Sequence, residues 1–410
     1  MVRLAIVGIG GYGWDLARLI LGLSEKLGCR LVAAADPRFA ELPERASQLR
    51  EAGAELFADA AAMFDALRDR CEGVYIATGI PSHAPLAIAA FEAGYHVHLE
   101  KPPAATVQEV DAMVRAARAA GRMCLVGFQA LHSRDIHFLK ERAVWERLRP
   151  VRSIVCHAGW PRSRAYYGRN AWAGRLRRGT AWVLDGPATN ALSHQVVNML
   201  FLAGAEASRL AEPAAVRAEL YAAGPVEAHD TAAIEIRTAD GPPVVFLGTH
   251  CSERQFGPVI DLRAEAGAAT WEMGRGAVVR YADGSQERCE ADPCGGREAM
   301  VANFVEALRA DDASLLRCPL AATRPFVLAL DAAHESSGRI HRIAASHAGT
   351  QEPDAGDGRT VVEGIDELLV ECAERRCLFS DLDGAPPWAV ATEPYALDGD
   401  YRFPQRFRPA

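Results

Sequence analysis

Residues 3–36 read RLAIVGIGGYGWDLARLILGLSEKLGCRLVAAAD, and this stretch decides how the chain begins to fold. An apolar run over residues 4–7 is followed by Gly8, Gly10 and Gly13, spaced as G-x-G-x-x-G. A segment with apolar residues at helical spacing comes next, and a second apolar run leads to the acid at position 36. The order predicts a strand, a tight turn, a helix and a second strand, which is typical of a dinucleotide-binding site.

Each glycine has a physical role in this interpretation. Gly8 allows the sharp turn after the strand, Gly10 lets the backbone approach a pyrophosphate, and Gly13 lets the helix pack closely on the sheet. The start of the helix offers N–H groups and a positive dipole end to phosphate. Asp36 can accept hydrogen bonds from a ribose diol and would repel a 2′-phosphate, which favours NAD. Arg38 could offset that repulsion, so NADP is the alternative.

Composition and charge narrow the class of protein. The 410 residues suffice for two domains, and the net charge of -8 argues against a nucleic-acid partner. No apolar run of the length of a membrane span occurs, so we expect no membrane partner. The 10 cysteines are scattered without a C-x-x-C pair, which favours free thiols in the cytoplasm over a zinc site, and no metal is predicted.

The first third of the chain alternates between strand and helix patterns. Beyond the opening unit, strands are predicted at residues 56–57, 74–77, 96–99 and 124–126, and helices at 41–52, 60–70, 83–93 and 106–121. This alternation predicts an α/β domain over residues 1–127, with a doubly wound parallel sheet. Ligands bind beyond the carboxyl ends of such strands. Thr78 and the pair Glu100-Lys101 fall at these ends.

The pattern changes after residue 127. Strands are predicted at residues 154–157, 232–238, 244–249, 259–264, 269–272 and 277–281, and helices at 189–202, 298–309, 321–337 and 366–375. Residues 160–179 look irregular, and residues 346–359 look like a loop. We therefore predict a second, α+β domain over residues 128–410 with an open, largely antiparallel sheet. An exposed apolar face of that sheet would suit a homo-oligomer.

Lys101 is the first candidate for chemistry. It follows a buried strand and precedes Pro102, which biases it away from helix. Desolvation can lower a lysine pKa enough for proton transfer, or the cation can polarise a substrate oxygen. The alternative is a solvated lysine paired with Glu100.

A second candidate group lies in residues 189–194, TNALSH. Asn190 and His194 are four residues apart and would share a helix face, and an imidazole suits a general base. A structural histidine is the alternative. Asp185 could cap the helix or contact a ligand. Weaker candidates are Thr78, Pro81 and His83 on the nicotinamide side, Gln129 after the last strand, and Arg162, Arg164, Tyr166, Tyr167 and Trp172 as stacking partners of a sugar or as surface residues.

Four stretches carry a family resemblance: Gly8-Ile9-Gly10-Gly11-Tyr12-Gly13, Ala35-Asp36-Pro37, PSHAPLAIAAFEAGYHVHLEKP at residues 81–102, and NALSH at residues 190–194. Residues 303–309 and 332–337 resemble the closing helices of the same family. The chain thus resembles the glucose-fructose oxidoreductase / inositol dehydrogenase / MocA (Gfo/Idh/MocA) family. The resemblance implies a Rossmann domain, an open-faced α+β substrate domain and a tightly bound nicotinamide cofactor.

The resemblance also implies roles for particular residues. The residues matching Lys101 and His194 serve in proton transfer, and an aspartate usually stands where this chain has Asn190. An amide cannot support an imidazolium as a carboxylate does, so Lys101 would take more of the proton work. Expected cofactor contacts are Gly8, Ile9, Gly10, Gly11, Tyr12, Gly13, Asp36, Arg38, Thr78, Pro81, His83, Glu100, Lys101 and Gln129, and expected substrate contacts are Lys101, Tyr167, Trp172, Asn190 and His194.

Three functional hypotheses follow. The first is an NAD(H)-dependent oxidoreductase acting on a secondary alcohol of a sugar, sugar derivative or cyclitol, with Lys101 and His194 flanking the alcohol oxygen. The second is a glycosidase or lyase that oxidises its substrate transiently with tightly bound NAD. The third is a non-catalytic, NAD-dependent regulator of a partner protein. We expect a cytoplasmic homodimer or homotetramer.

Overall fold

The structure is a computed structural model, and it describes residues 1–142, 147–206, 209–352 and 357–409. The chain divides into two compact units. The first comprises Met1–Ala104, Gln108–His132 and Gly296–Arg324, and the second comprises most of the remaining chain. The expected division at residue 127 differs from this, because the first unit extends to His132, Ala105–Val107 belongs to the second unit, and Gly296–Arg324 belongs to the first. Phe304 and its neighbours from that segment are buried in the core of the first unit.

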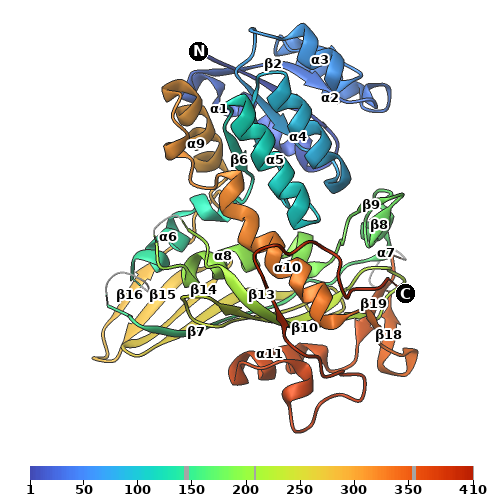
Figure 1. Ribbon diagram of the computed structural model, residues 1–410, viewed down its shortest axis with the longest axis vertical. Coiled ribbons are helices and arrows are strands. Elements are labelled where there is room, and N and C mark those ends of the chain that lie inside the picture. Colours follow the sequence, from blue (N-terminus) through green and yellow to red (C-terminus); the bar gives the residue numbers. More distant parts are fainter. Residues whose placement is uncertain (143–146, 207–208, 353–356, 410) are drawn as a thin grey trace. The chain divides into compact units, whose positions relative to one another are not determined.

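The first unit is built on a six-stranded sheet in the order β3-β2-β1-β4-β5-β6. All neighbouring strands pair parallel, which confirms the predicted doubly wound sheet (Figure 1). The strands are β1 (Val2–Val7), β2 (Cys29–Ala35), β3 (Glu55–Phe57), β4 (Gly73–Ile76), β5 (His96–Leu99) and β6 (Cys124–Val126). The strand order reverses between β1 and β4, where doubly wound sheets bind their ligands.

Helices of the first unit pack their apolar stripes on this sheet. Leu16 and Ile20 of α1 are buried against Leu4 and Ile6 of β1. The helices are α1 (Tyr12–Leu27), α2 (Pro43–Glu51), α3 (Ala60–Ala66), α4 (His83–Glu92), α5 (Val107–Ala120) and α9 (Arg297–Ala310), with short 3-10 turns at Phe39–Glu41, Ile80–Ser82, Gln129–His132, Ala313–Leu315 and Leu320–Thr323. α3 ends at Ala66, four residues before the expected end at Arg70, because the polar residues that follow bury little surface.

The second unit is built on a ten-stranded mixed sheet in the order β16-β15-β14-β13-β7-β12-β11-β10-β17, with β20 pairing β10. Among the described strands of this sheet, the β7–β12 and β10–β17 pairs are parallel and the other pairs are antiparallel. The strands are β7 (Val151–Gly159), β10 (Pro213–Ala222), β11 (Thr231–Thr238), β12 (Val244–Thr249), β13 (Phe256–Ala264), β14 (Gly267–Glu272), β15 (Gly276–Tyr281), β16 (Gln286–Cys289), β17 (His341–Arg342) and β20 (Tyr395–Ala396). β10 was not predicted from the sequence, because Arg217 and Glu219 interrupt its apolar pattern.

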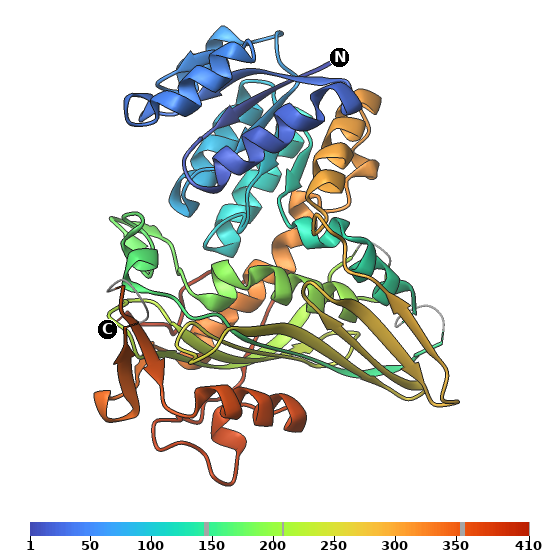
Figure 2. The same ribbon diagram turned by 180° about the vertical axis from the view of Figure 1, so that it is seen from behind.

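Helices cover both faces of this sheet, with α8 and α10 on one face and α11 on the other (Figures 1 and 2). The helices are α6 (Arg134–Lys140), α7 (Arg164–Gly168), α8 (Ser193–Ala203), α10 (Arg324–Ser337) and α11 (Ile365–Arg375), with short turns at Pro187–Ala191, Ala345–His347 and Phe379–Asp381. None of the helices in the described part of the chain has the length and apolar character needed to span a membrane.

Two segments expected to be irregular contain regular structure. Residues 160–179 include α7 and the first strand of a small pair, β8 (Arg177–Arg178) with β9 (Ala181–Trp182). The expected loop at residues 346–359 contains β18 (Ala348–Gln351), which pairs with β19 (Arg359–Val362), while residues 353–356 lie outside the described residues.

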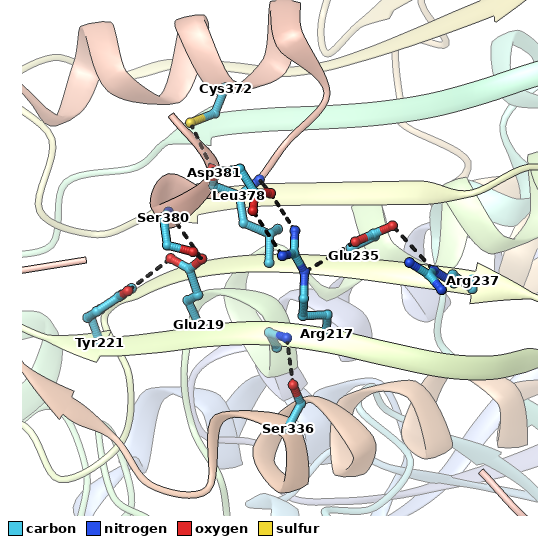
Figure 3. Close-up of polar contacts among 11 residues, drawn as sticks. Arg217, Glu219, Tyr221, Glu235, Arg237, Ser336, Cys372, Leu378, Ser380 and Asp381 are labelled. Atoms are coloured by element: carbon cyan, nitrogen blue, oxygen red, sulfur yellow. Dashed lines mark hydrogen bonds and ion pairs between the residues drawn. The ribbon is translucent and has the colours of Figure 1, made fainter. Parts of the chain in front are cut away.

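The sheet face that we expected to be exposed is partly covered by the chain itself. Leu369 and Cys372 of α11 pack on Leu247 of β12 in one apolar cluster. Figure 3 shows the polar contacts beside it, where Arg217 pairs with Asp381 and Ser380 Oγ donates to the buried Glu219 at 2.6 Å. This cover lies over β7 and β10–β12, and the homo-oligomer stays a prediction.

Candidate functional site

The glycine turn after β1 packs closely against α1 on one side and is open on the other. Gly8 has a φ of 88°, and a Cβ on Gly13 would lie 2.1 Å from the Gly8 carbonyl oxygen, so α1 packs directly on the turn. Gly11 precedes α1 with a φ of 47° and no side-chain cap. A Cβ on Gly11 would meet nothing within 4 Å among the described residues. The turn therefore leaves space at the positive end of α1, where a pyrophosphate would bind.

Asp36 is fixed beside that turn. Its carboxylate is 3% exposed, and it accepts hydrogen bonds from the backbone N–H groups of Ile9 and Arg38, both at 2.9 Å. The Arg38 Nε lies 3.6 Å from Asp36 Oδ1, and the end of the Arg38 side chain lies over Gly10. The structure thus brings together four of the expected cofactor residues. It also places a cation beside the acid, which keeps NADP as the alternative to NAD.

Glu100 and Lys101 follow β5 at the same edge of the sheet. Glu100 is buried, and its Oε2 accepts the Lys101 backbone N–H at 3.2 Å. Its Oε1 has no hydrogen-bond partner among the described residues, and a Cβ on Gly127 would lie 2.6 Å from it. Burial raises the pKa of Glu100 to about 7, against the opposing charge of Lys101. Gly127 is therefore the residue that makes room for this carboxyl group.

His83 connects two loops instead of facing open space. Its Nδ1 lies 2.9 Å from the carbonyl oxygen of Pro102, and its Nε2 lies 3.1 Å from that of Thr78. Burial lowers the pKa of His83, so the ring is neutral and donates from one nitrogen. Pro81 lies in the short turn just before, in Ile80–Ser82. Thr78 Oγ1 is buried and has no hydrogen-bond partner among the described residues.

Tyr12 and Gln129 meet although they are far apart in sequence. The Tyr12 hydroxyl donates to Gln129 Oε1 at 2.9 Å. Burial raises the pKa of Tyr12, so the phenol stays protonated and donates.

These features fit a dinucleotide. The glycine turn packs closely against α1, and α1 begins without a side-chain cap. Asp36 is held where a ribose is expected. Buried polar atoms of Glu100 and Thr78 at the same edge of the sheet also lack a hydrogen-bond partner among the described residues.

Asn190 and His194 do not lie on one regular helix, so the expected helix over residues 189–202 is wrong at its start. Pro187–Ala191 forms a π-helical turn in which the Leu192 N–H donates to the Pro187 carbonyl oxygen at 2.7 Å. Leu192 has φ −105° and ψ 15°, and α8 begins only at Ser193. The four-residue spacing on a helix therefore does not apply across Leu192.

Asp185 holds the Asn190 side chain. It is 3% exposed, its Oδ1 accepts Asn190 Nδ2 at 2.7 Å, and its Oδ2 accepts the Gly174 N–H at 2.7 Å. The amide nitrogen of Asn190 is thereby directed to Asp185, which leaves the amide oxygen as the acceptor. Neither role that the sequence suggested for Asp185 included this contact. The one feature of the sequence that pointed to this contact was the position of Asp185, five residues before Asn190.

An aromatic and arginine cluster lies in the segment that reaches Asp185 through the backbone of Gly174. The Tyr167 hydroxyl lies 2.9 Å from Nδ1 of His250, a residue that was not predicted from the sequence because it is distant from Tyr167 and lies outside any motif. Arg169 lies 3.6 Å from the ring centroid of Tyr166 and 5.4 Å from that of Trp172. His194, at the start of α8, is half-buried, and it lies in the second unit whereas Lys101 lies in the first.

Comparisons with known proteins agree with the fold. Residues 2–128 match the sequence model of the oxidoreductase family with an NAD-binding Rossmann fold, GFO_IDH_MocA. An inositol 2-dehydrogenase of Azotobacter vinelandii is 29% identical over 197 residues, 48% of this chain and 52% of the relative. A 2,7-anhydro-N-acetylneuraminate hydratase of Mediterraneibacter gnavus is 35% identical over 128 residues, 31% of each chain. The matched stretches thus span about half the length of the first relative and about a third of the second.

A solved structure of levoglucosan dehydrogenase, in complex with NADH and L-sorbose, superposes with a TM-score of 0.69 at 19% identity, over 82% of this chain and 97% of that one. This likeness extends the agreement in fold to both units. The first unit is an NAD-binding Rossmann domain. The match of residues 2–128 to this family model agrees with the resemblance carried by the sequence stretches in that part of the chain.

Proposed function

We propose that this chain is an NAD(H)-dependent oxidoreductase that acts on a secondary alcohol of a sugar, sugar derivative or cyclitol. The observation that carries the proposal is the placement of Lys101 beside the buried Glu100, at the same sheet edge as the Asp36 carboxylate and the glycine turn. A nicotinamide supplies the hydride acceptor or donor when it is bound. The names of the dehydrogenase relatives support this class of reaction.

The chain's own residues divide the remaining work. Asp36 accepts hydrogen bonds from ribose hydroxyls, while the glycine turn and the start of α1 hold the pyrophosphate. Lys101 stabilises the alcohol oxygen and moves its proton, and His194 serves as the second proton-transfer group. Asn190, with its amide nitrogen held by Asp185, offers its oxygen as an acceptor to a substrate hydroxyl or to an imidazole N–H.

The test is the absorbance of NADH during incubation of the purified protein with NAD and a panel of sugars and cyclitols. Net NADH that accumulates in proportion to one substrate is the expected result. A panel that yields no NADH and no other product, with a protein shown to bind NAD, would contradict the proposal.

A transient-redox glycosidase or lyase is the second candidate. It is favoured by the hydratase relative, whose name describes a reaction without net oxidation. In this case the product accumulates without added acceptor, and the NADH absorbance rises and falls while the cofactor stays bound.

A non-catalytic regulator is the third candidate, and in that protein replacing Lys101 would leave partner binding intact. A cytoplasmic homodimer or homotetramer stays a prediction for each.

A further inference from the structure

The segment over residues 160–182 has an unusual charge for this chain. It contains six arginines and five aromatic residues but no aspartate or glutamate, in a protein whose net charge is -8. The arginines are Arg162, Arg164, Arg169, Arg175, Arg177 and Arg178. The segment leaves the end of β7 and runs beside the end of β12, since the Arg162 N–H donates to the His250 carbonyl oxygen at 3.0 Å. Positive charge is therefore concentrated where β7 and β12 end in the second sheet.

Five of these six arginines, Arg162 and Arg169 among them, form no ion pair with a carboxylate within the described residues. Arg175 pairs with Glu227, but no ion pair joins Arg162 or Arg169 to an acid within the described residues. Both guanidinium groups lie near the ring of Tyr166, at 4.6 Å for Arg162 and 3.6 Å for Arg169. Arg162 Nε is also buried without a hydrogen-bond partner in the described part of the chain. Two cations beside the same ring, one of them with a buried donor that has no partner among the described residues, would be stabilised by an anionic group.

Two acids whose charges act on Tyr167 are already engaged in hydrogen bonds. Asp185 accepts hydrogen bonds from Gly174 and Asn190, and Asp230 accepts backbone N–H groups from Ala223 and Gly224. Burial, and after it the charge of Asp185, raises the pKa of Tyr166. Burial, and after it the charges of Asp230 and Asp185, raises the pKa of Tyr167.

His250 adds a buried donor to the same place. Burial, followed by the charges of Arg162 and Arg169, lowers its pKa well below the ordinary value, so the ring is neutral. In the tautomer in which the Tyr167 hydroxyl donates to Nδ1, the proton lies on Nε2, which has no hydrogen-bond partner among the described residues. An acceptor group on a ligand would satisfy this donor as well.

We propose that the substrate carries an anionic group, a carboxylate or a phosphate, that Arg162 and Arg169 bind while Asn190 contacts a hydroxyl. Asp185 links the two parts, because it holds both Asn190 and the backbone of Gly174, two residues after Trp172. Trp172 and Tyr166 supply the apolar faces on which a sugar ring stacks. This inference rests on the proposed function in taking the ligand to be a sugar or cyclitol.

The test compares matched pairs of compounds on the NAD-loaded full chain. D-glucuronate and glucose 6-phosphate are compared with D-glucose, and an inositol monophosphate with myo-inositol, both as substrates and as ligands by calorimetry. We expect the anionic member of a pair to bind at least about 10-fold more tightly, and its affinity to fall as salt is added. Preference for glucuronate would identify a carboxylate, and preference for the phosphates would identify a phosphate.

Arg162→Met and Arg169→Met remove the charges and keep an apolar stem. Each should weaken binding of the anionic compound about 10- to 100-fold, with no change for the neutral compound or for NAD. Arg178→Met is the matched control, since Arg178 is exposed in the same segment outside the cluster, and it should change nothing. Arg169→Lys should restore part of the affinity. Melting temperatures show that each variant is folded.

Calorimetry separates this inference from the proposed function, because anion binding is measured without turnover. Arg-dependent binding of an anion without NADH formation would support the anion site and count against the oxidoreductase. Equal binding of the neutral and anionic compounds, or no Arg-dependent binding of any anion, would overturn the inference even if NADH forms with a neutral sugar.

Discussion

The glycine turn of the first unit and the asparagine turn of the second are each organised by a buried aspartate, but in different ways. Asp36 accepts two backbone N–H groups, one of them from Ile9 within the glycine motif. Asp185 accepts one backbone N–H and the side-chain amide of Asn190. The first arrangement depends on backbone geometry and tolerates many side chains, whereas the second depends on the identity of two side chains. The two sites should therefore respond differently to substitution.

The largest expected effect is at the backbone-built site. Gly13→Ala places a Cβ 2.1 Å from the Gly8 carbonyl oxygen, and backbone cannot move aside as a side chain can. We expect a loss of about 4 kcal/mol in the free energy of unfolding and at least a 100-fold weaker NAD affinity. Gly22→Ala on the same helix is the control, because its Cβ would meet nothing within 4 Å in the described residues. Denaturant unfolding and calorimetry measure both quantities, and equal behaviour of the two variants would refute the close packing.

The second prediction concerns the side-chain-built site. Asn190→Asp puts a second carboxyl group 2.7 Å from Asp185, and like charges raise the pKa of the introduced group. When the pKa of a carboxyl group is higher in the folded than in the unfolded state, the protein loses stability as the pH rises from the unfolded-state pKa through the folded-state pKa. We expect a loss of about 3 kcal/mol at pH 8, largely recovered at pH 4.

The double variant Asp185→Asn with Asn190→Asp exchanges the two groups and is the matched control. It should recover most of the stability at pH 8, because one carboxylate again faces one amide. Unfolding curves of the three proteins across pH measure this, and a flat pH dependence for Asn190→Asp would mean that the two side chains do not touch.

The third prediction concerns Glu100, the acid of the first unit whose pKa is raised by burial. The pKa of Glu100 is raised from 4.5 to about 7 by burial, so the folded protein loses stability as the pH rises between these values. Glu100→Gln removes the titration, and its stability relative to the parent should increase by roughly 2 to 3 kcal/mol between pH 5 and pH 8. Glu92→Gln, at an exposed carboxyl of the same unit, should keep the parent's profile. Parallel profiles for Glu100→Gln and the parent would argue against a buried, protonated acid.

The smallest expected effect is at Tyr12. Tyr12→Phe removes the hydroxyl that donates to Gln129 at 2.9 Å and should cost about 1 kcal/mol, because one part-buried hydrogen bond is lost. NAD affinity should change by less than about 5-fold. Gln129→Ala in the Tyr12→Phe background gives the coupling between the two groups. A coupling near zero would show that the contact contributes nothing to the fold.

The sequence predicted the first unit well because its signals are local. Spacing among Gly8, Gly10 and Gly13 fixes a backbone path, and compact apolar runs mark its buried strands. Local sequence signals could not predict that Gly296–Arg324 belongs to the first unit. Phe304 of that segment packs in the core of the unit against residues that are far away in the sequence.

The second unit was predicted less fully. β10 was missed because Arg217 and Glu219 are matched by Asp381 and Ser380, which only the folded chain brings near. The break at Leu192 and the contact of Tyr167 with His250 also come from non-local packing. Residue types still indicated the candidate site, since Asn190, His194, Tyr167 and Trp172 were named from the sequence, but their arrangement was not.

The central claim is tested most directly by the turnover of Lys101→Ala on the best substrate, with NAD affinity measured in parallel. Lys26→Ala is the control, because Lys26 is an exposed lysine of the same unit that pairs with Glu298 at 3.4 Å. The account predicts that kcat for Lys101→Ala falls about 100- to 10,000-fold while NAD binds within about 3-fold of the parent. Unchanged turnover in Lys101→Ala would contradict the proposed role of Lys101 and, with it, the proposed oxidoreductase site.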